Sequence, residues 1–391
     1  MWFLFMKKKR TFKYWIGQIH LWLGLASGLI VVIVSITGCL FAFQSEISNV
    51  TYKKTFFITP VNEKVLPLSE LKEKAQTALG NNQPINYITT FKRADMAWEF
   101  MAYKMNDTAL TYFGATEYFK SVFINPYNGQ ITGFRNYKYD FFNIVKYVHW
   151  SLLLNSKYGQ PIVGYSTLIF VVLLITGLIL WFPKKWNKAT KQQSFKIKWK
   201  AKFKRVNYDL HNVLGFYSLL FALVLALTGM VFSFSWFQAA VYVVASGSTK
   251  PPEQFMGKSI KSDTVFSVAG IDKAYFQMRA IYPDADRIGV SPASGNEGLI
   301  YASAYRGKEV YYDRDDLVFD QYSGKLLHTQ LAGKKNNGEK ITDMNYDIHV
   351  GAIGGITGKI IAFIISFICA SLPITGFLIW WGKQKKLRIK N

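Results

Sequence analysis

The amino-acid sequence predicts a membrane protein with an all-α core of four spanning helices and two extracytoplasmic α+β domains. We expect a tandem repeat of helix, domain and helix. Three observations favour this fold class: four long apolar segments, basic clusters beside their ends, and two intervening segments that resemble each other. Half of the 391 residues are hydrophobic and 17% are aromatic.

The four apolar segments are expected at residues 16–43, 160–182, 209–237 and 356–381. Each has more than 18 largely apolar residues, enough for a helix rising about 1.5 Å per residue to cross a hydrocarbon layer of about 30 Å. Tryptophans gather at their ends, as in an interfacial aromatic belt. The lipid bilayer is therefore the first predicted partner.

The net charge of +23 is concentrated in three short stretches. Residues 7–13 hold five Lys or Arg, residues 184–205 hold ten and residues 383–390 hold five, with no acidic residue among them. Cytoplasmic flanks of spanning helices carry such an excess. A nucleic-acid partner is excluded, because it would need a basic face on a folded domain.

This charge pattern gives an orientation. The basic N-terminus (1–15), the loop 183–208 and the tail 382–391 are predicted to be cytoplasmic. Segments 44–148 and 238–348 then lie on the far side of the membrane. The protein is expected to be multi-pass, with both termini in the cytoplasm.

Two cysteines fall inside apolar segments, which favours packing roles and excludes a disulfide scaffold. One of them, Cys39, also allows an alternative interpretation as the lipidated residue of a lipoprotein signal. Against this, Thr37-Gly38 recurs as a Thr-Gly pair in the other three apolar segments, where processing is excluded.

The two far-side segments share a motif. Phe123–Ile131 and Val318–Leu326 each read as a strand, a turn containing Tyr and Gly, and a second strand. Upstream of these, Leu68–Leu79 and Val268–Ile281 are predicted helices. A repeat of this kind sets the architecture of the chain. Pro373 is expected to kink or break the fourth helix.

Four of the five histidines lie at the ends of the apolar segments, in a duplicated order. His20 and His211 are each followed 17 residues later by Thr-Gly. His149 and His349 begin the segments 149–182 and 349–381, each predicted as an interfacial stretch and a span, with Thr-Gly 27 and 26 residues on, respectively. The fifth, His328, is interpreted as an ordinary surface residue.

These motifs resemble the PepSY-associated transmembrane family of bacterial iron-regulated membrane proteins, over nearly the whole chain. The resemblance rests on His-Leu-Trp-Leu-Gly at 20–24, Leu-His-Asn-Val-Leu-Gly at 210–215, His-Trp-Ser-Leu at 149–152, the Thr-Gly-x-x-x-Trp endings and the tyrosine turns. It implies two periplasmic PepSY-like domains and a bacterial inner-membrane location. Some members are similar to di-haem siderophore-iron reductases.

Two histidines on each side of the membrane are what two haem b groups would need, because haem iron takes one axial nitrogen from each side. His20 and His211 are predicted to bind the inner haem iron, and His149 and His349 the outer one. Gly24 and Gly215 lie one helical turn after their histidines, which would leave space for the macrocycle.

Carboxylates two residues before two of the histidines, Asp209 and Asp347, are possible hydrogen-bond partners of the imidazoles, although this spacing does not put them on the same helix face as the histidines. The Thr-Gly pairs lie about 25 Å along their helices from His20 and His211, near the opposite site. Zinc or copper is disfavoured, because no Cys, Asp or Glu cluster accompanies the histidines. No catalytic residue is identified.

The resulting hypothesis is an inner-membrane oxidoreductase that passes electrons outward to a ferric siderophore or other chelated iron. Its donor would be a quinol or a separate cytoplasmic reductase, because no nucleotide-binding motif is present. One alternative is a non-enzymatic PepSY module that binds peptides or regulates a protease or uptake complex. Another is a siderophore or iron transporter, which the scarcity of intramembrane charges disfavours.

Overall fold

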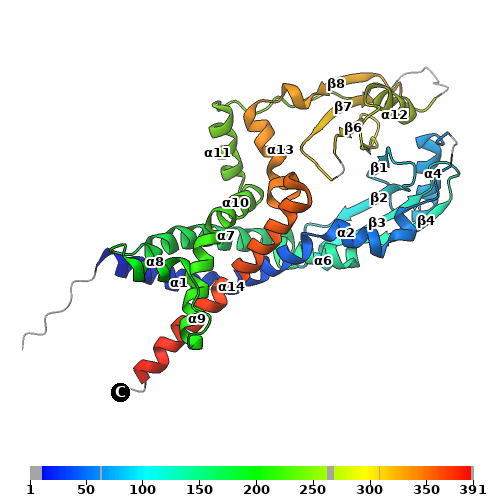
Figure 1. Ribbon diagram of the computed structural model, residues 1–391. Coiled ribbons are helices and arrows are strands. Elements are labelled where there is room, and N and C mark those ends of the chain that lie inside the picture. Colours follow the sequence, from blue (N-terminus) through cyan, green and yellow to red (C-terminus); the bar gives the residue numbers. More distant parts are fainter. Residues whose placement is uncertain (1–10, 62–63, 262–267, 308, 389–391) are drawn as a thin grey trace, which may run out of the picture.

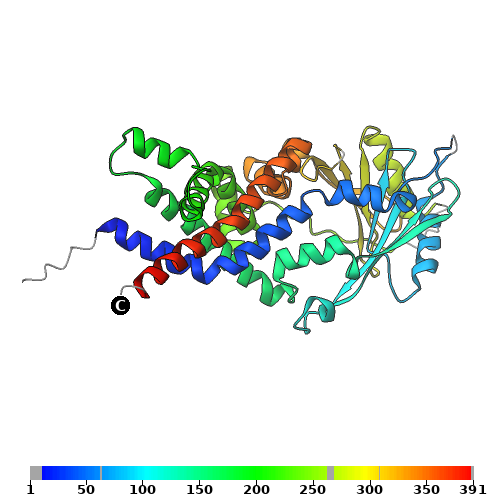
Figure 2. The same cartoon turned by 60° about the horizontal axis from the view of Figure 1, so that its bottom comes forward.

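The computed structural model describes residues 11–61, 64–261, 268–307 and 309–388. Most of the basic N-terminal cluster (within 1–10) and the last residues of the tail lie outside this description. A helical bundle forms one end of the molecule and a β-sheet the other (Figures 1 and 2). The first helix begins, and the last ends, at the bundle end away from the sheet.

Within the described residues, four helices are long and apolar enough to cross a membrane, which confirms the four expected spans. Each helix begins four to six residues before its expected segment; the first three end slightly earlier than expected and the fourth ends three residues later. The spans are α1 (Phe12–Phe41), α7 (Ser156–Trp181), residues Phe203–Ser233, and Ala352–Gln384 within η4 (Ala352–Gly354) and α14 (Gly355–Arg388).

The third span combines α9 (Phe203–Asp209), the π-helical turn η2 (Leu210–Leu214) and α10 (Gly215–Ser233). It ends at Ser233, earlier than expected, because the extended residue Phe234 separates it from α11 (Ser235–Ser246).

Helix packing joins the four spans into one bundle. Helices α1 and α10 each pack against both α7 and α14. A Cβ added at Gly28 of α1 would lie 3.3 Å from the Cβ of Pro373 on α14, so the missing side chain lets these helices approach closely. Helix α14 continues through Pro373, so the break considered for this position does not occur.

Shorter helices lie in the segments that contain the strands: α2 (Gln44–Thr51), α3 (Lys53–Phe56), α5 (Tyr112–Ala115), η1 (Tyr137–Tyr139), α6 (Phe141–Ser151), η3 (Ala332–Lys334) and α13 (Asn337–His349). Helix α8 (Lys188–Phe195) instead lies in the loop between α7 and the third span.

One antiparallel sheet of eight strands forms the other end of the molecule. The strand order is β4-β3-β2-β1-β5-β6-β7-β8. The strands are β1 (Tyr87–Phe91), β2 (Trp98–Met105), β3 (Thr116–Ile124), β4 (Ile131–Asn136), β5 (Arg287–Ser291), β6 (Leu299–Tyr305), β7 (Arg314–Asp320) and β8 (Leu326–Gln330). The sequence predicts two α+β domains, but their strands join as one sheet because β1 pairs with β5, with Thr89 opposite Gly289.

The core of the sheet end lies under two helices, α4 (Leu68–Leu79) and α12 (Gly270–Ile281). Leu71, Ile88 and Ile288 are fully buried in it, and burying each such side chain stabilises the fold by about 1.5–3 kcal/mol. The two helices are linked by the Ser69 backbone N–H, which donates to Asp272 Oδ1 at 2.8 Å.

Both expected hairpin turns are present. The Gly129 N–H donates to the Asn125 carbonyl at 2.9 Å, and the Gly324 N–H donates to the Asp320 carbonyl at 3.0 Å. Gly129 and Gly324 have φ of 73° and 68°, the left-handed region in which glycine is least strained.

Helices α6 and α13 carry the chain from the sheet back to the bundle. The Asp140 carboxylate caps α6 by accepting from the N–H groups of Phe142 and Asn143, and it forms a buried ion pair with Arg135 at 2.9 Å. Asn336 and Glu339 form a capping box at the start of α13. Each helix therefore begins at a residue fixed by its side-chain cap, and each ends close to a histidine.

Replacing Asp140 with alanine should destabilise the protein strongly, since Arg135 would keep a buried charge without its carboxylate. Loss of one partner of a buried pair costs about 3–5 kcal/mol. Thermal unfolding in detergent should show a clearly lower Tm. Asp284→Ala, which removes an exposed partner of Lys92, should leave the Tm nearly unchanged; equal effects of the two variants would contradict the assignment.

Candidate functional site

The four histidines at the span ends meet in two pairs. The ring centres of His20 and His211 are 6.3 Å apart, with their planes at 89°. Those of His149 and His349 are 6.0 Å apart, with their planes at 69°. We refer to these as the terminus-side pair and the sheet-side pair. In each pair, one residue comes from the first half of the chain and one from the second.

A threonine on a neighbouring helix holds each imidazole. The Nδ1–Oγ1 distances are 2.9 Å for His20–Thr176, 3.2 Å for His149–Thr37, 2.9 Å for His211–Thr375 and 2.9 Å for His349–Thr228. These are the threonines of the Thr-Gly pairs. The sequence places those pairs near the opposite site but gives no sign that they contact the histidines.

The hydrogen bonds fix which ring nitrogen carries the proton. Each of these threonine hydroxyls donates to a carbonyl of its own helix, for example Thr37 Oγ1 to the Ile33 carbonyl at 2.8 Å. The hydroxyl oxygen is then left to accept from the imidazole Nδ1–H. The Val34 carbonyl accepts from His149 Nδ1 at 2.9 Å and the Leu372 carbonyl from His211 Nδ1 at 3.1 Å. A neutral imidazole protonated on Nδ1 has a free lone pair on Nε2.

The glycine of each Thr-Gly pair leaves room for the imidazole ring of a histidine. An added Cβ would lie 3.2–3.5 Å from a histidine Cε1: His149 at Gly38, His20 at Gly177, His349 at Gly229 and His211 at Gly376. Larger side chains at these positions would push the rings away from their threonines. The small residue therefore admits the imidazole itself.

The two carboxylates considered as possible partners of the histidines have other partners. Asp209 accepts from Arg205 Nε at 2.9 Å and from the Lys198 backbone N–H at 3.1 Å. Asp347 accepts from the backbone N–H groups of Tyr311 and Tyr312, both at 2.9 Å. Neither carboxylate is bonded to a histidine, in agreement with the expectation that a residue two positions before a histidine faces another side of the helix.

The glycines near the histidines have different surroundings. Added Cβ atoms at Gly24 and Gly215 would lie 3.9 and 3.6 Å from the side chains of Leu173 and Leu372, so these glycines face neighbouring helices. Their predicted role beside a macrocycle remains a prediction. Gly351 has φ of 77°, and an added Cβ would lie 2.5 Å from the Gly358 carbonyl oxygen, so it shapes the turn between α13 and α14.

Tight local geometry precedes or follows several histidines. His211 lies within the π-helical turn η2, an irregularity that is frequent at functional sites. After His149, α6 ends at Ser151, and both Leu152 and Leu153 have positive φ, 55° and 59°. Such values are rare for residues other than glycine. They lie in the turn that leads from α6 into α7.

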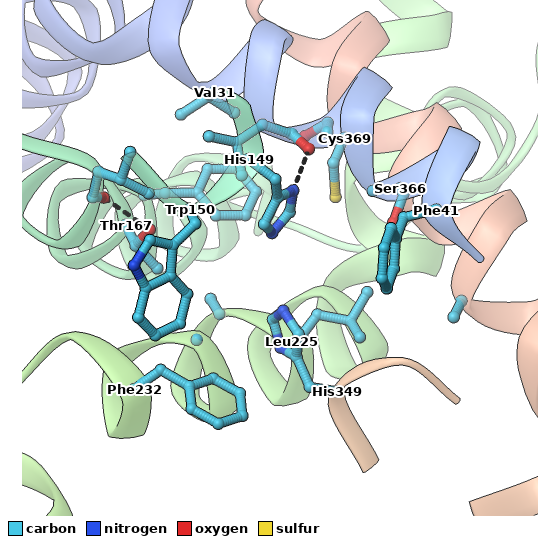
Figure 3. Close-up of a pocket in the computed structure, with 18 of the residues that line it drawn as sticks. Val31, Phe41, His149, Trp150, Thr167, Leu225, Phe232, His349, Ser366 and Cys369 are labelled. Carbon is cyan, nitrogen blue, oxygen red and sulfur yellow. Dashed lines mark hydrogen bonds between the residues drawn. The ribbon is translucent and has the colours of Figure 1, made fainter. Parts of the chain in front are cut away.

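A cavity of about 260 Å³ lies at the sheet-side pair. His149 and His349 face each other across it in Figure 3, with Trp150 and Phe232 to one side and Phe41 to the other. Its lining is mainly apolar and small: Ile30, Val31, Val34, Ser35, Gly38, Phe41, Ala42, Lys146, His149, Trp150, Val163, Ser166, Thr167, Phe170, Ala222, Leu225, Ala226, Gly229, Phe232, Ser233, Tyr346, His349, Val350, Ala362, Ser366 and Cys369. The cavity is suited to a largely apolar group.

Electrostatics favour neutral imidazoles here. Burial lowers the pKa of His149 and of His349, so both are uncharged at neutral pH. Burial likewise lowers the pKa of Lys146. Burial raises the pKa of the Asp347 carboxyl, against the opposing effect of its backbone hydrogen bonds.

A second cavity, of about 250 Å³, lies between the sheet and the bundle and shares Phe41, Ala42, Tyr346 and Val350 with the first. Its buried cations have acidic partners. Lys359 is paired with Glu46 at 2.8 Å and with Glu309. The two cavities are therefore neighbours with different linings, one apolar and one charged.

Within the described residues, no group of three or more His, Cys, Asp or Glu side chains is placed to hold a metal ion. Zinc in proteins takes three or four such ligands. Two opposed imidazoles suit a metal whose other positions are filled by a bound group, as in haem. Two imidazoles at each of two separate places are therefore the donors that these sites offer.

The bundle, the sheet and the paired histidines define an integral membrane protein with two separate imidazole sites. A family described as the PepSY-associated TM region matches residues 18–383. The chain belongs to this family, which confirms the resemblance in the sequence. Among curated proteins, no match was found.

Proposed function

We propose that this protein is a haem-dependent reductase of the bacterial inner membrane that passes electrons across the bilayer to ferric iron, most simply as a ferric siderophore. His20 and His211 would bind one haem b and His149 and His349 a second. The observation that carries the proposal is the spacing of the two imidazole pairs.

The spacing fits axial ligation. With about 2 Å from iron to each nitrogen and about 1 Å more to each ring centre, two opposed imidazoles have centres about 6 Å apart. The observed values are 6.3 and 6.0 Å. Each Nδ1–H is already hydrogen-bonded to a threonine, the kind of partner that orients a ligating histidine and raises its basicity. The donor sets therefore fit haem at both places.

The two sites are placed to form a path across the membrane. His20 and Thr37, which holds His149, are 17 residues apart on α1, about 25 Å of helix, compared with a hydrocarbon thickness of about 30 Å. The basic loop and helix ends lie at the bundle end away from the sheet (Figure 1). By the positive-inside rule that end would be cytoplasmic and the sheet periplasmic.

Each part of the chain would have a defined task. Bound haem would supply one-electron transfer. The threonines hold the imidazoles neutral with Nε2 free, and the apolar lining of the sheet-side cavity excludes water. A quinol or separate reductase would donate at the terminus side, and the iron chelate would accept at the sheet side. Ferrous iron then leaves more easily, because it is a weaker partner for hard oxygen ligands.

The duplicated hydrogen-bond pattern supports descent from a repeated unit. Within the first half, His20 bonds to Thr176 and His149 to Thr37. The second half contains the corresponding bonds from its own two histidines to its own two threonines. We propose that each half is one copy, and that a haem site forms only where the two copies meet.

Vesicles test the function directly. Protein would be reconstituted in liposomes loaded with dithionite, with ferric citrate and a ferrous-iron indicator outside. We expect external ferrous iron to appear far faster than in protein-free vesicles, and His349→Ala to abolish the gain. Haem-loaded protein that gives no gain would contradict the proposal, and uptake of iron without its reduction would indicate a transporter instead.

Histidine variants should separate the two sites. His20→Ala and His149→Ala should each remove about half of the haem Soret absorbance per chain, because each site loses one axial ligand. The matched control is His328→Ala, since His328 stacks on Phe255 at 4.8 Å, away from both pairs. Full absorbance in either ligand variant would contradict the assignment.

Threonine variants should tune the sites without removing a ligand. In Thr228→Val, His349 loses its hydroxyl acceptor and becomes a weaker donor to iron, so the midpoint potential of one haem should rise and haem affinity should fall about tenfold. Thr167→Val is the control: its hydroxyl also lines the sheet-side cavity but bonds to the Val163 carbonyl. Unchanged potentials in Thr228→Val would contradict the role of the hydroxyl.

A further inference from the structure

The sheet-side cavity contains one charged side chain among its 26 lining residues, the ammonium group of Lys146. The other lining residues are apolar, hydroxyl-bearing or imidazole side chains. A cation beside an apolar cavity loses hydration and is stabilised only if an anion or strong acceptor replaces the water. At this position Lys146 would be stabilised by an anionic group or a strong hydrogen-bond acceptor.

The described residues provide no anionic partner. No ion pair or hydrogen bond to the Lys146 ammonium is present among them, and its recorded neighbours are the rings of Tyr147 at 5.1 Å and Phe119 at 6.0 Å. Two buried cations nearby differ in this respect: Arg135 is paired with Asp140 and Lys359 with Glu46. Aromatic faces attract a cation, but less strongly than a carboxylate does.

The position of Lys146 relative to the ligand is also informative. It precedes His149 by three residues on α6, so both side chains lie on one face of that helix, one turn apart. The helical turn that carries Lys146 lies on the sheet side of His149, because Lys146 contacts Phe119, a residue of β3. The corresponding residue three before His349 is Tyr346, which also lines the cavity but carries no charge. The two halves therefore differ here, and the site has one charged edge.

We infer that Lys146 binds a carboxylate of the group held between His149 and His349, so that the carboxylate edge of the tetrapyrrole faces the sheet and its apolar edge faces the bundle. This inference rests on the proposed haem binding. Lys146 is then a positioning residue for the sheet-side haem. It would set the orientation of the bound group, and it would neutralise the negative charge of a carboxylate at the ring edge.

The test compares haem b with its dimethyl ester, which lacks the carboxylate charges. Wild type and Lys146→Met would be loaded with each form, and transfer to excess apomyoglobin would be followed. We expect Lys146→Met to release one of two bound haem b groups about tenfold faster, and wild type to release one dimethyl ester faster by a similar factor. Lys146→Met should release the ester at the same rate as the wild type releases the ester.

Controls separate charge from folding. Lys146→Arg should restore slow release. Lys157→Met, which changes an exposed lysine on the first turn of α7, should release haem like wild type. Equal release of haem b and its ester by wild type would overturn the inference, even if Lys146→Met failed to fold. Wild type that binds no haem would instead overturn the proposed function.

Discussion

The hydrogen bond between a histidine Nδ1–H and a threonine of the neighbouring helix is the interaction on which the site depends. It occurs four times, at 2.9–3.2 Å. It ties α7 to α1 and α14 to the third span, selects the tautomer with Nε2 free, and aims each ring at its partner. Because each threonine hydroxyl also donates to its own helix, its oxygen has a fixed direction. The adjacent glycine matters for the same reason, since a larger side chain would displace the ring.

The sheet has a comparable role for the two halves of the chain. Pairing of β1 with β5 joins eight strands into one sheet, and α6 and α13 lead from it to the sheet-side histidines. The geometry of that pair thus depends on residues far from the bundle, such as Asp140 at the start of α6. A shift of the sheet would move both imidazoles, which links the folding of the sheet end to the assembly of the site.

Much of this architecture is predictable from the sequence because hydrophobicity and charge are local properties. The four spans, the hairpin turns and the family follow from runs of apolar residues, glycine positions and short motifs. The partners of the histidines do not follow, since Thr176 and His20 meet only when two helices pack side by side. Asp209 and Asp347 illustrate a limit of closeness in sequence: they stand two residues before a histidine, but helix geometry directs them to other partners. The joining of the two expected domains into one sheet could not be predicted either, because pairing between the edge strands β1 and β5 leaves no local pattern in the sequence.

The central claim is that these imidazoles bind iron between them, and haem content measures it most directly. A pyridine haemochrome assay on protein purified from haem-replete cells should give two haem b per chain, with a low-spin spectrum expected of two axial imidazoles. Protein that is folded, with all four histidines present, but colourless would contradict the account.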